Sequence, residues 1–155
     1  MEVNLIRADS KDAAFIWNMQ KEAFAELYKK YRDTETNPAA ESIERVSNRL
    51  QQPFTHYYLI EYRGAIAGAI RIVDPKDGKQ PKRISPMFIL AAYRKRGLAQ
   101  QAITEAERIH GNENWMLETI LEETDLCRLY EKMGYRKTGK TEKLRENMTL
   151  AFYRK

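Results

Sequence analysis

The segment ISPMFILAAYRKRGLAQQAITEAER, residues 84–108, decides the fold of this chain. Its apolar run from Ile84 to Leu90 has the length of a buried strand. The turn Arg94-Lys95-Arg96-Gly97 follows, and after it small or apolar residues recur at helical spacing, namely Leu98, Ala102, Ala106 and Ile109. The segment therefore predicts a strand, a tight basic turn and an amphipathic helix that packs on a sheet.

The basic turn before the predicted helix has the properties of an anion site. The first amides of a helix have no partner inside the helix, and they carry the positive end of its dipole. Gly97 and the small Ala99 let the main chain approach an anion closely, while Arg94, Lys95 and Arg96 add positive charge. A pyrophosphate fits such a site; the alternative is a solvated basic turn that only caps a helix. Neither a Walker loop nor a dinucleotide fingerprint occurs in the chain.

The pattern Arg94-x-x-Gly97-x-Ala99 resembles motif A, Q/R-x-x-G-x-G/A, of the GNAT superfamily of acetyl-CoA-dependent N-acetyltransferases. The resemblance implies that the turn, through Arg94, Lys95, Arg96, Gly97, Leu98 and Ala99, holds the pyrophosphate of CoA. It also implies that the end of the preceding strand, at Ile89 and Leu90, pairs with the pantetheine arm.

A second motif supports the same resemblance. Leu129-Tyr130-Glu131-Lys132-Met133-Gly134-Tyr135 is similar to the late helix and strand of that family, commonly written L-Y-x-k-x-G-F/Y. The chain departs from the family pattern at Glu123, seven residues before Tyr130, where Asn is common. This departure puts one usual contact to the pantetheine arm in question.

The composition is typical of a globular protein, because 43% of the 155 residues are hydrophobic and 10% are aromatic. We expect a single domain over residues 1–155. No apolar stretch approaches the ~20 residues of a membrane span, and Met1-Glu2-Val3-Asn4 lacks the basic and apolar regions of a leader. With a lone Cys127, which cannot form an internal disulfide, these features predict a cytoplasmic protein with no membrane partner.

The chain carries an excess of positive charge, with 27 Lys and Arg residues against 22 Asp and Glu and a formal net charge of +5. That excess admits nucleic acid as a partner. However, basic and acidic residues are interleaved along the chain, and the phosphates of CoA account equally well for the charge at Arg94 to Arg96. We therefore rank nucleic acid well below CoA as a partner.

The rest of the chain predicts further elements on both sides of this segment. They are a strand at 2–8, a long helix at 13–31, a short helix that begins at Asn37-Pro38 and ends near Pro53, a hairpin of 54–62 and 65–73 around Arg63-Gly64, a strand at 115–121, a helix between Thr124 and Gly134, and closing strands at 135–139 and 148–153. Pro86 inside the segment's strand argues for a bulge or an edge there. The element order is that of the GNAT fold. The resemblance thus implies an α/β (α+β) protein with a mixed, mostly antiparallel sheet of about seven strands flanked by about four helices.

Tyr130 and Glu118 are the candidate catalytic residues. A phenol is protonated at neutral pH and can donate to a departing thiolate, and in the family the tyrosine that matches Tyr130 has this role. The alternative is that Tyr130 is one more apolar aromatic. Glu118, in the middle of a predicted strand, is the best-placed base for an ammonium that must lose a proton before it attacks. The alternation of the strand leaves open whether Glu118 faces a cleft or solvent. Glu35, Glu122 and Glu123 could instead attract a cationic acceptor.

We therefore predict an N-acetyltransferase that moves an acetyl group from acetyl-CoA to a small cationic amine or a peptide N-terminus by direct attack in a ternary complex. The alternatives are a module that binds acyl-CoA without turnover and a basic nucleic-acid binder. His56 and His110 suit a strand and a helix end, and with one cysteine they offer no metal constellation, so we expect no metal. The oligomeric state is open, and a homodimer is compatible with the sequence.

Overall fold

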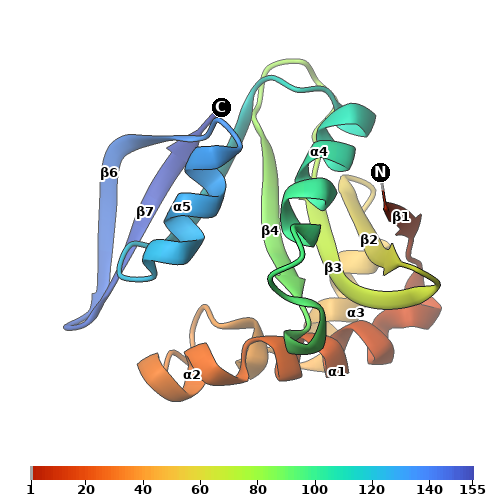
Figure 1. The fold of residues 1–155 in the computed structure, drawn as a ribbon, viewed down its shortest axis with the longest axis horizontal. Coiled ribbons are helices and arrows are strands. Elements are labelled where there is room, and N and C mark those ends of the chain that lie inside the picture. Colours follow the sequence, from red (N-terminus) through yellow and green to blue (C-terminus); the bar gives the residue numbers. More distant parts are fainter. Residues whose placement is uncertain (1) are drawn as a thin grey trace.

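The computed structural model describes residues 2–155, which form one seven-stranded sheet with helices on both of its faces (Figure 1). The strands are β1 (Val3–Arg7), β2 (Thr55–Tyr62), β3 (Ala65–Val73), β4 (Lys82–Ile89), β5 (Trp115–Ile120), β6 (Arg136–Arg145) and β7 (Met148–Arg154). The helices are α1 (Ala13–Ala23), α2 (Ala25–Tyr31), α3 (Ile43–Gln51), α4 (Leu98–His110) and α5 (Thr124–Lys132), with short 3-10 helices η1 (Ser10–Asp12), η2 (Pro38–Ala40) and η3 (Ala91–Tyr93). No helix within these residues combines the length and the apolar character that crossing a membrane requires.

The strand order is β1-β2-β3-β4-β5-β7-β6, and every neighbouring pair is antiparallel except β4–β5, which is parallel. This arrangement confirms the predicted mixed, mostly antiparallel sheet. Residues 2–155 contain five α-helices where the sequence predicts about four, because the predicted helix at 13–31 is divided in two.

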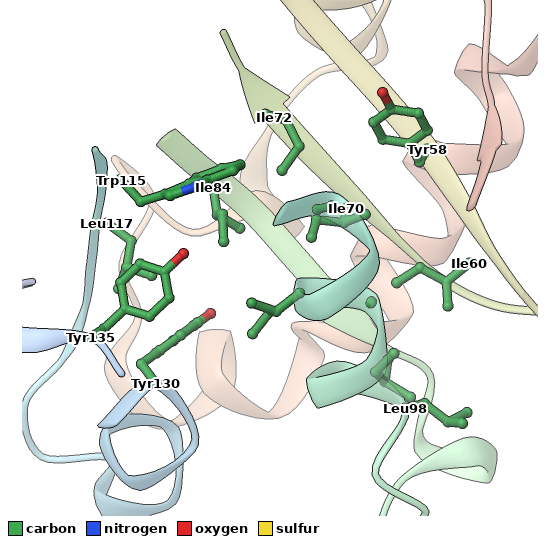
Figure 2. Close-up of a cluster of buried hydrophobic side chains, with 14 of the residues drawn as sticks. Tyr58, Ile60, Ile70, Ile72, Ile84, Leu98, Trp115, Leu117, Tyr130 and Tyr135 are labelled. Atoms are coloured by element: carbon green, nitrogen blue, oxygen red, sulfur yellow. The ribbon is translucent and has the colours of Figure 1, made fainter. Parts of the chain in front are cut away.

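Helices α4 and α5 cover one face of the sheet, and α1 and α3 cover the other. The pleat of β3 divides its side chains between the two layers. Ile70 and Ile72 belong to the buried cluster that contains Leu98 of α4, as Figure 2 shows, whereas Ala69 belongs to the cluster that contains Ile16 of α1. Any polar side chain on a strand is therefore assigned to the α4 face or to the α1 face by its register.

One predicted turn and one predicted bulge of the sheet are confirmed. Arg63 and Gly64 have φ angles of +49° and +79°, the left-handed values that a tight hairpin between β2 and β3 requires. In β4, Ser85 and Pro86 together lie opposite the single residue Arg71 of β3, because the pairing shifts between Ile70 and Ile72. The bulge expected at Pro86 is thus present, and it lies in the strand that leads into the basic turn.

The C-terminal end of α4 is anchored by a buried chain of hydrogen bonds. Nδ1 of His110 lies 2.7 Å from a carboxylate oxygen of Asp74, and its Nε2 lies 2.8 Å from the hydroxyl of Tyr58. The ring of His56 on β2 packs edge-on at 4.8 Å from that of His110. Burial, together with the positive charge of Arg7, lowers the pKa of His56 to about 4. Both histidines thus occupy the strand and helix-end positions that the sequence predicts.

Several predicted boundaries are wrong in an informative way. The helix at 13–31 is interrupted at Phe24, whose φ and ψ of −101° and 5° are not helical, and no proline or glycine marks this break. Asn37 caps only η2, and α3 begins later at Ile43, with Ser42 as its cap. Strand β6 extends to Arg145, through residues that the sequence assigns to a charged loop.

One prediction for the face of α4 is also wrong. Ile109, expected on the buried face with Leu98, Ala102 and Ala106, is 43% exposed, whereas Glu107 is buried. The carboxylate of Glu107 is accommodated because it accepts hydrogen bonds from the Tyr135 hydroxyl at 3.0 Å and from Lys155 Nζ at 2.8 Å. A helical wheel could not have predicted a partner that lies at the other end of the chain.

Candidate active site

The basic turn before α4 presents a run of unpaired main-chain amides. Gln101 makes the first hydrogen bond of the helix, to the carbonyl of Gly97 at 3.2 Å. The six amides from Lys95 to Gln100 donate to no acceptor within residues 2–155. Gly97 has φ +74°, and a Cβ built on it would meet nothing within 4 Å. The turn therefore presents a run of main-chain donors without partners at a helix start, and Lys95, Arg96 and Gly97 within it are exposed, as the predicted anion site requires.

Arg94 differs from the two basic residues that follow it. Its Nε donates to the carbonyl of Ile89 at 2.8 Å, and its Nη2 donates to the carbonyl of Ala23 at 2.9 Å. The guanidinium thus joins the end of β4 to the end of α1. These hydrogen bonds shape the turn, and the side chain of Arg94 is nevertheless exposed like those of Lys95 and Arg96.

The strand that leads into the turn has an unpaired edge. β4 and β5 pair only at Lys82–Trp115 and Arg83–Met116, after which the two strands part. Figure 1 shows β4 and the β7–β6 hairpin diverging toward α2. Leu90 donates its amide to Ala67 of β3 at 2.8 Å, so by the alternation of an antiparallel ladder the amide of Ile89 faces the side that β5 has left. Of the two residues predicted to pair with pantetheine, Ile89 presents its amide outward, while its carbonyl accepts from Arg94, and the amide of Leu90 is used by the sheet.

Tyr130 of α5 lies on the α4 side of the parted strands. Its side chain is 9% exposed, and its ring centroid is 6.1 Å from that of Tyr135. Figure 2 shows the Tyr130 hydroxyl directed away from α5 toward α4. Burial raises the pKa of Tyr130 to about 12, so the phenol stays protonated. Unlike Tyr135, it has no hydrogen-bond partner in the described part of the chain.

Glu118 lies on the opposite face of the sheet from Tyr130. Its neighbours Leu117 and Thr119 on β5 are buried, whereas Glu118 shares with Arg83 of β4 the face that α1 and α3 cover elsewhere. Arg83 Nη2 forms an ion pair with one Glu118 oxygen, and the other oxygen is buried without a partner. The side chain keeps 21% of its surface exposed. The sequence left open whether Glu118 faces a cleft or solvent. In the structure Glu118 faces Arg83, next to the point where β4 and β5 separate.

The remaining candidate carboxylates near α5 already have partners in the protein. Glu122 accepts from the amide of Thr149 at 2.7 Å. Glu123 accepts from the hydroxyl of Tyr31 at 2.5 Å and from Lys30 Nζ at 2.6 Å. Burial alone would raise the pKa of Glu123, but these two hydrogen bonds outweigh it and leave the pKa lowered. Where the family often has Asn, this chain has a carboxylate that ties α2 to the start of α5, while Glu35 remains exposed in its loop.

Sequence reasoning missed Arg71 and Arg83. Arg71 Nη1 donates to the carbonyl of Ser85 at 2.6 Å and so binds the β4 bulge from the neighbouring strand. The available signal was Pro86, which predicted the bulge but not the residue that would bind it. Among residues 2–155 no group of three or more His, Cys, Asp or Glu side chains is arranged to hold a metal ion.

Comparison with known proteins places these features in context. The family model described as acetyltransferase (GNAT) family matches residues 15–135. An acetyltransferase from Thermus thermophilus superposes with a TM-score of 0.73 at 16% identity, covering 99% of this chain and 96% of that one. Spermidine N-acetyltransferase from Vibrio cholerae, in complex with CoA and spermine, gives a TM-score of 0.78 at 14% identity, covering 98% and 94%.

A third similar structure is the microcin C7 self-immunity acetyltransferase MccE, in complex with acetyl-CoA and AMP. It gives a TM-score of 0.72 at 16% identity, covering 98% of this chain and 91% of that one. At these identities the likeness establishes a common fold. No curated protein sequence matches the chain significantly.

Proposed function

The chain belongs to the acetyltransferase (GNAT) family, and on that premise we propose that it moves an acetyl group from acetyl-CoA to a primary amine by direct attack within a ternary complex. The observation that carries the proposal is the run of six unpaired amides from Lys95 to Gln100, which follows a strand with an unpaired edge. The acceptor in this proposal is a small cationic amine or a peptide N-terminus. The Vibrio cholerae structure with spermine is compatible with an acceptor of the first kind.

The residues around the turn suit the nucleotide end of acetyl-CoA. The amides from Lys95 to Gln100, aided by Lys95 and Arg96, would bind the pyrophosphate, and the outward amide of Ile89 would pair with an amide of the pantetheine arm. Because the turn follows β4, an arm bound this way runs back along β4 toward the bulge at Ser85. Acetyl-CoA supplies an activated thioester carbonyl, and these contacts would hold that carbonyl where the strands part.

Tyr130 is the proposed acid. Its buried phenol keeps its proton at neutral pH, and its hydroxyl is not engaged by another group in the described part of the chain, so it can donate to the departing sulfur. Glu118 is the proposed base on the opposite face of the sheet. With acid and base on opposite faces, the thioester and the amine can be held side by side between them.

The proton balance is simple. The amine nitrogen forms a bond to the acyl carbon while the carbon–sulfur bond breaks. An ammonium that becomes an amide loses two protons, of which one leaves through Glu118 and the other replaces the proton that Tyr130 gives to sulfur. The ion pair with Arg83 lowers the basicity of Glu118, so we expect this pair to loosen when the acceptor binds.

The test is a comparison of two neighbouring tyrosines in acetyl transfer, followed by release of free thiol from acetyl-CoA with a panel of amines. We expect Tyr130→Phe to lower kcat by about a hundredfold, since general acid catalysis typically contributes 10²–10⁴. The matched control is Tyr135→Phe, which removes a hydroxyl engaged by Glu107 and should lower stability while kcat stays within about threefold.

A non-catalytic module that binds acyl-CoA is the second candidate, and the ion pair between Arg83 and Glu118 favours it, because that pair occupies the proposed base. It predicts that CoA raises the melting temperature while no amine in the panel is acetylated. Silence across the panel together with no stabilisation by CoA would contradict both candidates.

A further inference from the structure

Arg71 is a buried cation without a counter-ion. It is 9% exposed, and its only hydrogen bonds within residues 2–155 go to neutral acceptors, the Ser85 carbonyl at 2.6 Å and Gln52 Oε1 at 3.4 Å. Its Nε is buried and has no partner. Buried charges in proteins are normally paired, because removing a charge from water is costly. The hydrogen bond to the bulge uses one N–H group of the guanidinium and does not compensate its positive charge.

The neighbouring charges do not supply the missing anion. Arg49 is held by Glu41 in a bidentate pair, with both nitrogen–oxygen distances at 2.9 Å. Arg83 is paired with Glu118. Burial, together with the nearby charge of Arg49, lowers the pKa of Arg71 to about 10, which still leaves it protonated at neutral pH. Glu41 also pairs with the exposed Arg45 at 3.6 Å, so four guanidinium groups share two carboxylates, and the charge of Arg71 remains uncompensated.

This charge lies where the proposed reaction would take place. Arg71 contacts the bulge of β4, and Arg83 occupies the last residue pair before β4 and β5 part. Three buried side-chain atoms of these residues and of Glu118 have no hydrogen-bond partner, namely Arg71 Nε, Arg83 Nε and Glu118 Oε2. Two donors beside one acceptor match a ligand that carries both an anion and an ammonium.

We propose that the acceptor is an amine that also carries a carboxylate, which is bound by Arg71 and Arg83 so that its ammonium lies against Glu118. The inference rests on the proposed acetyl transfer, and it narrows the acceptor from cationic amines in general to amines that also carry a carboxylate. A carboxylate competes with Glu118 for Arg83, so the acceptor itself releases the base that must deprotonate it. A polyamine such as spermine has only positive charges to offer, and it would be repelled by the uncompensated Arg71.

The test uses matched acceptors that differ only in the carboxylate: L-phenylalanine with phenethylamine, β-alanine with ethylamine, and L-lysine with cadaverine. We expect at least one amino acid to exceed its decarboxylated partner in kcat/KM by about tenfold or more, the size of a charge-assisted hydrogen bond. Arg71→Met and Arg83→Met should each remove that preference by raising KM for the amino acid, so that the ratio of kcat/KM between the amino acid and its decarboxylated partner falls toward one. Arg63→Met, at an exposed hairpin turn, is the control that should keep the preference.

Arg71→Met also loses the contact to Ser85, so the half-exposed Arg83→Met carries the test if the first variant does not fold. A second readout does not need turnover: with CoA present, the N-acetylated amino acid should raise the melting temperature of the wild type more than the N-acetylated amine does. Acetylation without any preference for a carboxylate, or equal stabilisation by both products, would overturn the inference and leave the acetyltransferase proposal standing. No turnover and no stabilisation by CoA would instead overturn the acetyltransferase proposal.

Discussion

The two edges of β4 differ although they belong to one strand. Along one edge β4 pairs with β3 from Arg83 to Ile89, and the strands approach so closely that a Cβ on Gly68 would lie 2.0 Å from the carbonyl oxygen of Phe88. Along the other edge β4 pairs with β5 at two positions only. The closed edge satisfies its main-chain groups within the sheet and supports stability. The open edge leaves main-chain amides without a partner, so one strand provides a scaffold and, in the proposed function, the surface that binds the pantetheine arm.

The closed edge can be broken by a single methyl group. Gly68→Ala would press its Cβ onto main-chain atoms of Phe88 and Ile89, which cannot move without shifting β4. We expect a loss of about 3 kcal/mol in the free energy of unfolding, at the upper end of overpacking effects. Urea denaturation measures it.

Gly64→Ala is the matched control for that substitution. It adds the same methyl where nothing lies within 4 Å, and its cost is only that of a positive φ, about 1 kcal/mol. Equal losses of unfolding free energy for the two variants would show that the close approach of β3 and β4 does not determine the cost of the added methyl group.

Acid should lower the free energy of unfolding through His56 on β2, the strand that pairs with β3. The pKa of His56 is lowered from 6.5 to about 4, by burial first and then by Arg7, so the folded state resists protonation that the unfolded chain accepts. Its contribution to stability is complete above pH 6.5 and is lost progressively as the pH falls toward 4. The shift alone corresponds to about 3 kcal/mol, and screening by solvent reduces the expected loss to about 2 kcal/mol.

The measurement compares unfolding of the wild type and of His56→Gln across that pH range. The free energy of unfolding of His56→Gln should depend less on pH than that of the wild type. An unchanged difference in stability between the two proteins at neutral pH and near pH 4 would contradict the prediction.

Arg94 and Lys95, just after β4, contrast a side chain that is hydrogen-bonded to the protein with one that is exposed. Arg94→Met removes hydrogen bonds to the carbonyls of Ile89 and Ala23, and should cost about 1.5 kcal/mol in stability. Lys95→Met alters an exposed side chain and should change stability by less than about 0.5 kcal/mol. Thermal unfolding of both variants without ligand measures the two losses. If the Lys95 variant were the less stable of the two, Lys95 and not Arg94 would be the residue that stabilises the turn.

The smallest effect concerns charge at the open edge. Arg96→Met should weaken binding of CoA about threefold at low ionic strength, and the effect should shrink as salt screens the exposed charge. Calorimetric titration at two salt concentrations measures it. Lys140→Met on the exposed strand β6 is the control, and an equal loss for that variant would mean that net charge, and not the turn, attracts CoA.

Local patterns predicted much of this molecule. Apolar runs and turn residues indicated β2 and β3 with the turn at Arg63-Gly64, and the glycine after Arg96 marked the start of α4. The same patterns could not place the break at Phe24, where no helix-breaking residue stands, or bury Glu107 against Tyr135 and Lys155. Those features depend on contacts between distant parts of the chain.

For the candidate site the division is similar. Tyr130 and the turn around Gly97 follow from short motifs, because a helix start and a helix face are set by residues a few positions apart. The partners Arg71 with Ser85 and Arg83 with Glu118 are 14 and 35 residues apart in sequence, and only strand pairing brings them together.

The sequence by itself determined which segments become strands and helices and which turn offers unpaired amides, because those choices depend on near neighbours. The tertiary structure decided that β5 parts from β4, that Glu118 faces Arg83 and that Arg71 is buried without a counter-ion. These outcomes depend on register and burial. Register moves a whole set of side chains from one face to the other, so no local pattern can determine it.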